Sequence, residues 1–240
     1  MNFNIPTAMQ LTATMTLIIG IALSFAMVGY PRALQHAIRL WVRGLLIQPF
    51  SYAFFSLRGQ VPDWLSIVVG NALLVIAFAH FMHALRVYNQ RRDPSIPMFV
   101  VIGTTIVGEI LLTYVWPSLP GRILFMSGVI AAMCGFGIHA IYSGRRQITR
   151  PEHVVAVMLA LGIVIMLIRA LTLPDSNLTA LTTSTPMQGI VFTYAALLPV
   201  TATAGFLLMC GERLNKDLGR LATLDPLTGV YNRRTMAEIA

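Results

Sequence analysis

The sequence predicts an all-α, polytopic membrane protein with seven transmembrane helices, and three observations lead to this fold class. Of its 240 residues, 56% are hydrophobic and 11% are charged, whereas roughly a quarter of the residues in a typical soluble domain are charged. Apolar stretches long enough to cross roughly 30 Å of hydrocarbon recur along the chain. The net charge of +8 comes from basic residues in short clusters between these stretches, which is typical of loops beside anionic lipids rather than of nucleic-acid binding.

The apolar stretches predict seven spans, several of which end at a proline such as Pro31, Pro117 or Pro174. In chain order, we expect them at about 8–30, 40–57, 65–88, 97–116, 123–143, 154–173 and 189–210. The first begins too far into the chain, and lacks the basic region and cleavage site, for a removable signal peptide. The second is the weakest, and the amphipathic stretch 32–43 that precedes it is suited to the inner membrane surface.

The distribution of arginine and lysine predicts an external N-terminus and a cytoplasmic C-terminus. One set of alternate junctions carries most of the basic residues, namely Arg32, Arg39, Arg43, Arg86, Arg91, Arg92, Arg145, Arg146, Arg150, Arg213, Lys216 and Arg220. The opposite side holds Arg58, Arg122 and Arg169. We therefore expect a multi-pass protein of the bacterial inner membrane, in contact with its lipids.

A short helix is expected to continue the seventh span into the cytoplasm. Gly211, Leu214, Leu218 and Leu221 recur at spacings of three and four residues, which is the seam of a coiled coil. An amphipathic connector lying on the inner leaflet is the alternative. The chain thus divides into a transmembrane domain at 1–210, a linker helix at 211–224 and the start of a further domain at 225–240.

The chain closes on the run DPLTG at 225–229, followed by NRR at 232–234, which together predict a turn leading into a helix. This run resembles the opening of a GGDEF domain, the α/β catalytic domain of diguanylate cyclases. The resemblance implies an output that joins two GTP molecules into cyclic di-GMP. It also implies a homodimer, because two such domains, each holding one GTP, must face each other.

The same resemblance implies that the residues that hold GTP and Mg²⁺ lie beyond residue 240, so we expect no catalytic residue in this chain. An output domain that binds nucleotide without forming product is the alternative. The residues expected to transmit a signal to the output are Leu214, Leu218, Leu221, Asp225, Asn232 and Arg233.

Ionisable residues inside the predicted spans are candidates for a functional site, because each is costly in hydrocarbon unless it is paired or faces a cavity. Glu109 and Arg169 both fall in the outer half of their spans. They are expected either to form an ion pair that joins the fourth and sixth spans or to line a ligand pocket. A retinal Schiff base is excluded, because the sole lysine is Lys216, outside the spans.

Three histidines make a second candidate site in the inner half of the membrane. His80 and His83 share one face of the third span, and His139 falls at nearly the same depth on the fifth. Two histidines at one depth could be axial ligands of a b-type haem, or part of a metal site with His36. Interfacial histidines bonded to neighbouring helices are the alternative.

The sequence therefore predicts a membrane sensory and dimerisation module that regulates a diguanylate cyclase through the linker helix. Its input is expected to be haem-based redox or gas sensing, or a lipophilic or periplasmic small molecule. A transporter is disfavoured, because the spans hold few charged or amide residues that could line a polar pathway.

Overall fold

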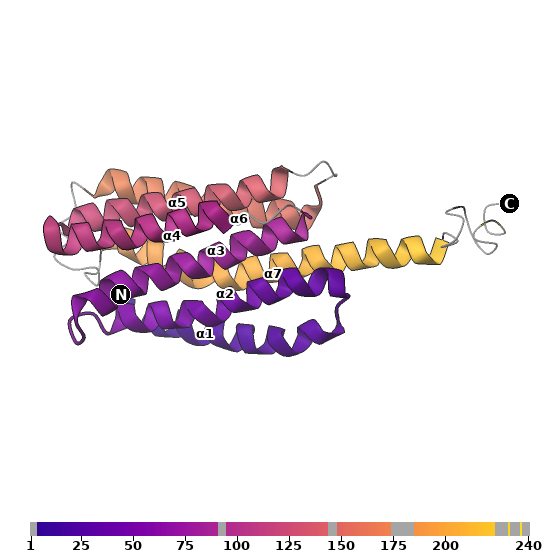
Figure 1. Ribbon diagram of the computed structural model, residues 1–240, viewed down its shortest axis with the longest axis horizontal. Coiled ribbons are helices and arrows are strands. Elements are labelled where there is room, and N and C mark those ends of the chain that lie inside the picture. The colour runs from indigo at the N-terminus through magenta and orange to yellow at the C-terminus, as the bar shows by residue number, and fades with distance from the viewer. Residues whose placement is uncertain are drawn as a thin grey trace.

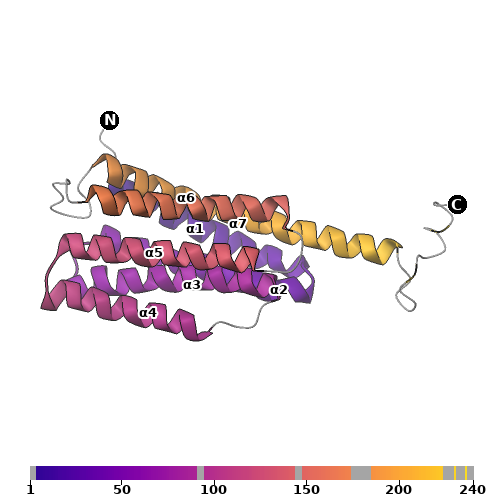
Figure 2. The same cartoon turned by 90° about the horizontal axis from the view of Figure 1, so that it is seen from above.

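The computed structural model describes residues 4–90, 95–143, 148–173, 185–223, 230 and 236. The secondary structure in these ranges is helical, without a strand. Seven long helices run back and forth in chain order, as Figures 1 and 2 show. They are α1 (Ile5–Ala26), α2 (Arg32–Ser56), α3 (Gly70–Tyr88), α4 (Ser95–Ile110), α5 (Leu119–Tyr142), α6 (Arg150–Thr172) and α7 (Pro186–Thr223). A 3-10 turn follows α1 (Met27–Gly29), and π-helical segments precede α3 (Trp64–Val69) and follow α4 (Leu111–Val115).

Six of the seven helices form a closed ring. In order around the ring, α1 packs on α2, α2 on α3, α3 on α5, α5 on α6, α6 on α7, and α7 on α1. The helix α4 lies outside this ring, against α3 and α5, as Figure 2 shows. The core therefore lies inside a ring of six helices, and α4 covers one of its seams.

The sequence-predicted spans are confirmed for six helices. Each of them is long and apolar enough to cross a membrane: Ile5–Gly29, Trp64–Tyr88, Pro97–Val115, Leu119–Tyr142, Arg150–Thr172 and Pro186–Gly219. The helix α2 is not among them, because Gln35, His36, Arg39, Arg43 and Gln48 make it too polar. Six helices of this length and apolar composition indicate a membrane protein.

The stretch that was expected to lie on the membrane surface, 32–43, belongs to the continuous helix α2, so this part of the prediction is wrong. Its apolar residues Leu34, Ile38 and Trp41 are buried within the bundle, and so are many of those in the predicted span 40–57, although Phe50 is 60% exposed. The packing of α2 against α3 is close, because a Cβ atom added to Gly44 would lie 2.5 Å from the Phe81 ring. One face of α2 is thus packed against its neighbours while Arg39 and Arg43 stay exposed, which is the pattern of an amphipathic helix.

Several helices begin at capping residues that the sequence specifies locally. Asn4 accepts a hydrogen bond from the backbone of Thr7 at 3.1 Å, and Ser118 accepts one from Gly121 at 3.0 Å. At the start of α6, the backbone N–H of Thr149 donates to the carboxylate of Glu152 at 2.7 Å. A proline occupies the first turn in each of these three helices, where its missing N–H has no intrahelical partner to lose.

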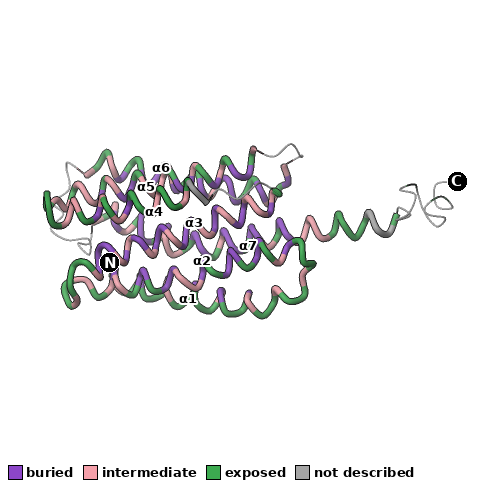
Figure 3. Tube along the Cα trace, viewed as in Figure 1, coloured by how far each residue is buried: buried purple, intermediate pink, exposed green. Residues whose placement is uncertain are grey.

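Helix α7 extends well beyond the ring as a single helix of 38 residues. Its residues Phe206, Met209 and Cys210 are fully buried, whereas Leu218 is 54% exposed. Figure 3 shows this change from buried to exposed along the projecting end. The predicted linker helix is therefore continuous with the last span up to Thr223.

Candidate functional site

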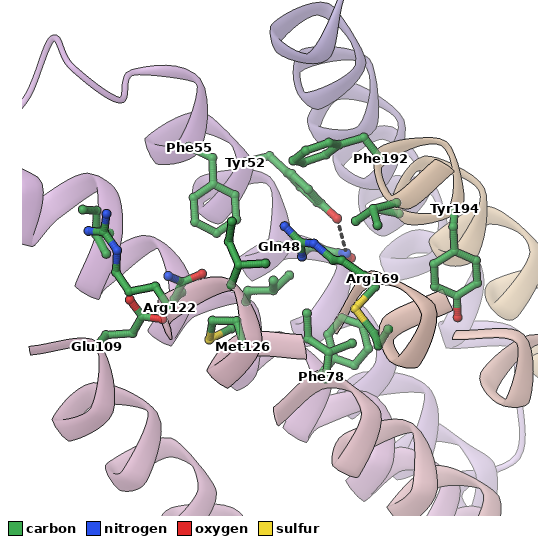
Figure 4. Close-up of a pocket in the computed structure, with 18 of the residues that line it drawn as sticks. Gln48, Tyr52, Phe55, Phe78, Glu109, Arg122, Met126, Arg169, Phe192 and Tyr194 are labelled. Atoms are coloured by element: carbon green, nitrogen blue, oxygen red, sulfur yellow. Dashed lines mark hydrogen bonds between the residues drawn. The ribbon is translucent and has the colours of Figure 1, made fainter. Parts of the chain in front are cut away.

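A cavity of about 100 Å³ lies inside the helix ring, towards the end of the bundle that holds the N-terminus. Helices α2 to α7 all contribute to its lining. Its wall is mainly apolar, but it also contains Arg58, Arg122, Arg169 and Glu109. Figure 4 shows Glu109, Arg122 and Arg169 among aromatic rings and Met126. Concave, mainly apolar sites with a few polar groups are typical of small-molecule binding.

Arg169 is the most deeply buried of the three arginines in this cavity. It occupies the last turn of α6, where a cation interacts favourably with the helix dipole, and it is 8% exposed. Its Nη2 donates to Oε1 of Gln188 on α7 at 3.2 Å. Its Nε has no hydrogen-bond partner. The local structure thus satisfies part of this guanidinium and leaves one donor open.

Glu109 lies at a different part of the same cavity. The side chain is fully buried, and neither carboxylate oxygen accepts a hydrogen bond. The charges that act on it are those of Arg122 and Arg58, with the Asn71 amide nearby. Glu109 and Arg169 do not form the expected ion pair, because α4 packs on α3 and α5 rather than on α6. The alternative expectation is the one that the geometry favours, since both residues line one cavity.

Arg58, in the loop after α2, and Arg122, in the first turn of α5, are the other two cations of the lining, and we call them the mouth of the cavity. The Arg58 guanidinium donates to the carbonyl oxygen of Ser66 at 3.3 Å and lies over the Phe55 ring. Burial, followed by the neighbouring charge of Arg122, lowers the pKa of Arg58 to about 10. Since this value is well above neutrality, Arg58 stays positive at pH 7. Arg122 donates to the Thr113 hydroxyl at 3.4 Å.

Gln48 and Tyr52 supply the polar surface of α2 in the cavity. Nε2 of Gln48 donates to the Tyr52 hydroxyl at 3.5 Å, whereas Oε1 of Gln48 is buried without a partner. Figure 4 shows the Arg169 side chain extending towards this pair. The cavity therefore presents two polar regions, one around Arg169 and one around Glu109, joined by apolar walls.

Sequence reasoning missed four of these polar residues. Arg58 and Arg122 were interpreted as loop charges that set the orientation, and Gln48 and Tyr52 were not singled out. Gln48 carried a usable signal, because an amide inside a predicted span is costly unless it is paired or faces a cavity. Nothing local in the sequence indicates that Arg58 and Arg122 share a cavity with Arg169, since these residues come from separate hairpins.

The histidines occupy the other end of the bundle. The His83 ring lies edge-on to the His36 ring, with 6.4 Å between their centroids. Nδ1 of His80 donates to the carbonyl oxygen of Ile76 at 2.8 Å on its own helix. His139 lines a second cavity of about 190 Å³, with Met82 and Arg86. Across the described ranges, no group of three or more His, Cys, Asp or Glu residues gathers into a metal site.

The haem hypothesis for His83 and His139 stays a prediction, and absorbance tests it. It predicts a Soret band and sharp reduced bands in the purified protein, lost in both His83→Ala and His139→Ala. His153→Ala is the matched control, because this exposed histidine bonds to the Tyr142 hydroxyl at 2.8 Å. Protein absorbance alone, from cells supplied with a haem precursor, would contradict the hypothesis.

The expected signal-transmission residues lie partly within the described structure. Leu214 is half-buried where α7 leaves the ring, Leu218 is exposed, and Leu221 lies in the last turn of the helix. Asp225, Asn232 and Arg233 lie outside the described residues. The two cysteines, Cys134 and Cys210, are buried and unpaired.

The exit of α7 is fastened to the end of α3. The Tyr88 hydroxyl donates to the carbonyl oxygen of Met209 at 2.9 Å. In return, Nη1 of Arg213 donates to the carbonyl oxygen of Tyr88 at 2.6 Å, and the guanidinium lies over the tyrosine ring. Comparison of the chain with protein-family models, curated proteins and solved structures finds no match.

Proposed function

We propose that this chain is a dimeric sensory module of the bacterial inner membrane, in which the state of the cavity alters the pose of α7. The observation that carries this proposal is that one continuous helix, α7, both lines the cavity and projects from the bundle. Phe192, Tyr194 and Leu198 of α7 line the cavity, and the same helix leaves the bundle and ends at Thr223. A rigid helix can carry a rotation or shift from one end to the other.

Aromatic rings connect the cavity to the exit of α7. Phe78 lines the cavity and contacts Phe81, whose ring lies 4.9 Å from that of Trp41. Trp41 stacks on Phe206 of α7 at 4.2 Å, and Phe206 contacts Tyr88. Because interior side chains are closely packed, a displacement of Phe78 would displace Phe81, Trp41 and Phe206 in turn.

A smaller cavity gives this series of rings some freedom to move. It measures about 20 Å³, lies beside Trp41 and Phe81, and shares Gln48 and Phe78 with the charged cavity. A void of this kind leaves the surrounding rings with fewer contacts than a filled core. In this proposal, the void gives the rings between the charged cavity and α7 room to shift when the charged cavity is filled.

The output in this proposal is a diguanylate cyclase domain that begins after residue 224. Its support is the resemblance of the run at 225–234 to the start of a GGDEF domain. In such an enzyme, a change in the relative pose of two α7 helices would bring the two GTP-binding domains together or apart. An output that binds nucleotide without making product would use the same membrane module.

The proposed topology has seven spans, an external N-terminus and a cytoplasmic C-terminus. Helix α2 counts as the seventh span because it runs the length of the bundle beside α1 and α3. The orientation is supported by the arginine clusters at the end from which α7 projects, including Arg32, Arg39 and Arg213. The charged cavity then opens towards the periplasmic half.

Cysteine cross-linking tests the dimer at the projecting end of α7. We expect Leu218→Cys to form disulfide-linked dimers in oxidised membranes, because Leu218 belongs to the predicted seam and is exposed in a single chain. Lys216→Cys is the matched control, since Lys216 is also exposed but pairs with Glu212 on another face of the helix. Buried Cys134 and Cys210 are expected to stay unreactive. Equal cross-linking at 216 and 218 would contradict the seam.

A further inference from the structure

We infer that the charged cavity binds an anionic amphiphile, whose head group pairs with Arg169 and whose hydrocarbon chain lies along the apolar wall. This inference names the ligand class of the site described above, and it rests on the proposed role of that cavity as the input. The head-group chemistry is a carboxylate or a phosphate, supplied either by a free single-chain compound or by a membrane lipid.

The first argument is that Arg169 is a buried cation for which no described residue supplies a counter-ion. No carboxylate of a described residue pairs with it, and the side chain is 8% exposed. The neutral Gln188 amide accepts one of its hydrogen bonds, while Nε remains open. An uncompensated buried charge costs several kcal/mol. A ligand anion would remove this cost and accept the open hydrogen bond.

The second argument is the balance of charge around the cavity. Three arginines and one glutamate line it, and Glu109 lies within the electrostatic influence of Arg122 and Arg58. The one acidic side chain among these lining residues is influenced by Arg122 and Arg58 and does not pair with Arg169, so the lining keeps a positive net charge. A cationic ligand would be repelled by this arrangement, and a neutral ligand would leave Arg169 unpaired.

The third argument is that the rest of the lining is hydrocarbon and aromatic. Phe78, Met126, Met166, Phe192 and Leu198 surround the space beside Arg169. Figure 4 shows Phe78, Met126 and Phe192 around the Arg169 side chain. A small inorganic anion would leave these walls without contacts, whereas an alkyl chain would fill the space between them. The cationic Arg169 and the apolar wall together favour a ligand with an anionic head group and a hydrocarbon chain.

A head-group series tests this inference on the intact chain in nanodiscs of phosphatidylcholine. Decanoate is the probe, and decanol and decyltrimethylammonium carry the same chain with a neutral or a cationic head. We expect decanoate to raise the unfolding temperature by about 3 °C or more at roughly ten times its Kd. Decanol and decyltrimethylammonium are expected to give no comparable shift. Nanodiscs that also contain phosphatidylglycerol distinguish the sources, because stabilisation by this lipid and loss of the decanoate shift would identify a membrane lipid as the ligand.

Variants of Arg169 test which residue holds the head group. Arg169→Gln should weaken decanoate binding by about tenfold or more, the loss typical of a hydrogen bond to a charged group. Arg169→Lys should retain part of the affinity, because it keeps the charge without the planar guanidinium. Arg150→Gln is the matched control on the same helix, at an exposed position remote from the cavity, and should bind as the unaltered chain does.

Equal stabilisation by decanol, or undiminished decanoate binding by Arg169→Gln, would overturn the inference. The head-group series does not depend on a variant, so it remains decisive if Arg169→Gln fails to fold. Failure of the ligand class is also distinguishable from failure of the proposed function. Cross-linking at Leu218 tests only the pairing of two α7 helices and does not depend on the ligand. If Leu218→Cys cross-links but decanoate has no effect, the ligand class is wrong and the proposed sensory role is not contradicted.

Discussion

Replacement of Trp41 by alanine is expected to lower the free energy of unfolding by about 3–5 kcal/mol, the usual range for a large buried aromatic residue. Trp41 is 3% exposed, stacks on Phe206 with an interplanar angle of 5°, and contacts Phe81. Its indole N–H donates to the Thr203 hydroxyl at 3.0 Å. The substitution would therefore open a cavity where α2, α3 and α7 meet, and leave Thr203 without its donor.

Unfolding of the purified protein in mixed detergent and denaturant micelles measures this effect. Trp64→Ala is the matched control, because Trp64 is 54% exposed and should change the stability by less than about 1 kcal/mol. Thr203→Val separates the hydrogen bond from the packing and should cost about 1 kcal/mol. Equal losses for Trp41→Ala and Trp64→Ala would show that Trp41 is not the contact that joins α2 to α7.

Insertion of two residues into α7 after Gly219 is expected to change the output several-fold, whereas insertion of seven residues should largely preserve it. Two residues turn the helix beyond the insertion by about 200°, which places the downstream seam on the opposite side. Seven residues restore the heptad phase and alter the length alone. The position lies in the projecting part of α7, so neither insertion disturbs the buried contacts of the ring.

A chimera in which residues 1–224 precede an active diguanylate cyclase domain provides the readout, measured as cyclic di-GMP in cells with matched expression. Combining the insertions with Tyr88→Phe examines the contact that fastens α7 to α3, because this substitution removes the donor to the Met209 carbonyl. An output that falls equally with two and with seven inserted residues would contradict transmission by helix phase. It would instead indicate that distance from the membrane controls the output.

The sequence by itself determined the helical fold class and the approximate position of the helices. Apolar run length and end signals are local properties, so the predicted spans at 65–88 and 97–116 agree closely with Trp64–Tyr88 and Pro97–Val115. The prediction was wrong at 32–43, because this stretch belongs to α2 and buries Leu34, Ile38 and Trp41 within the bundle. An apolar run describes one segment only and does not show which of its residues the other helices bury.

Tertiary structure decided which of the buried charges meet. The sequence placed Glu109 and Arg169 at similar depths, but depth does not specify the direction in which a side chain points around its helix. The ring order puts α4 outside and α6 opposite α2, so these two residues line one cavity instead of pairing. Arg58, Arg122 and Gln48 join them through contacts between segments far apart in the chain. Such contacts follow from the packing of whole helices, and no local pattern of residues encodes them.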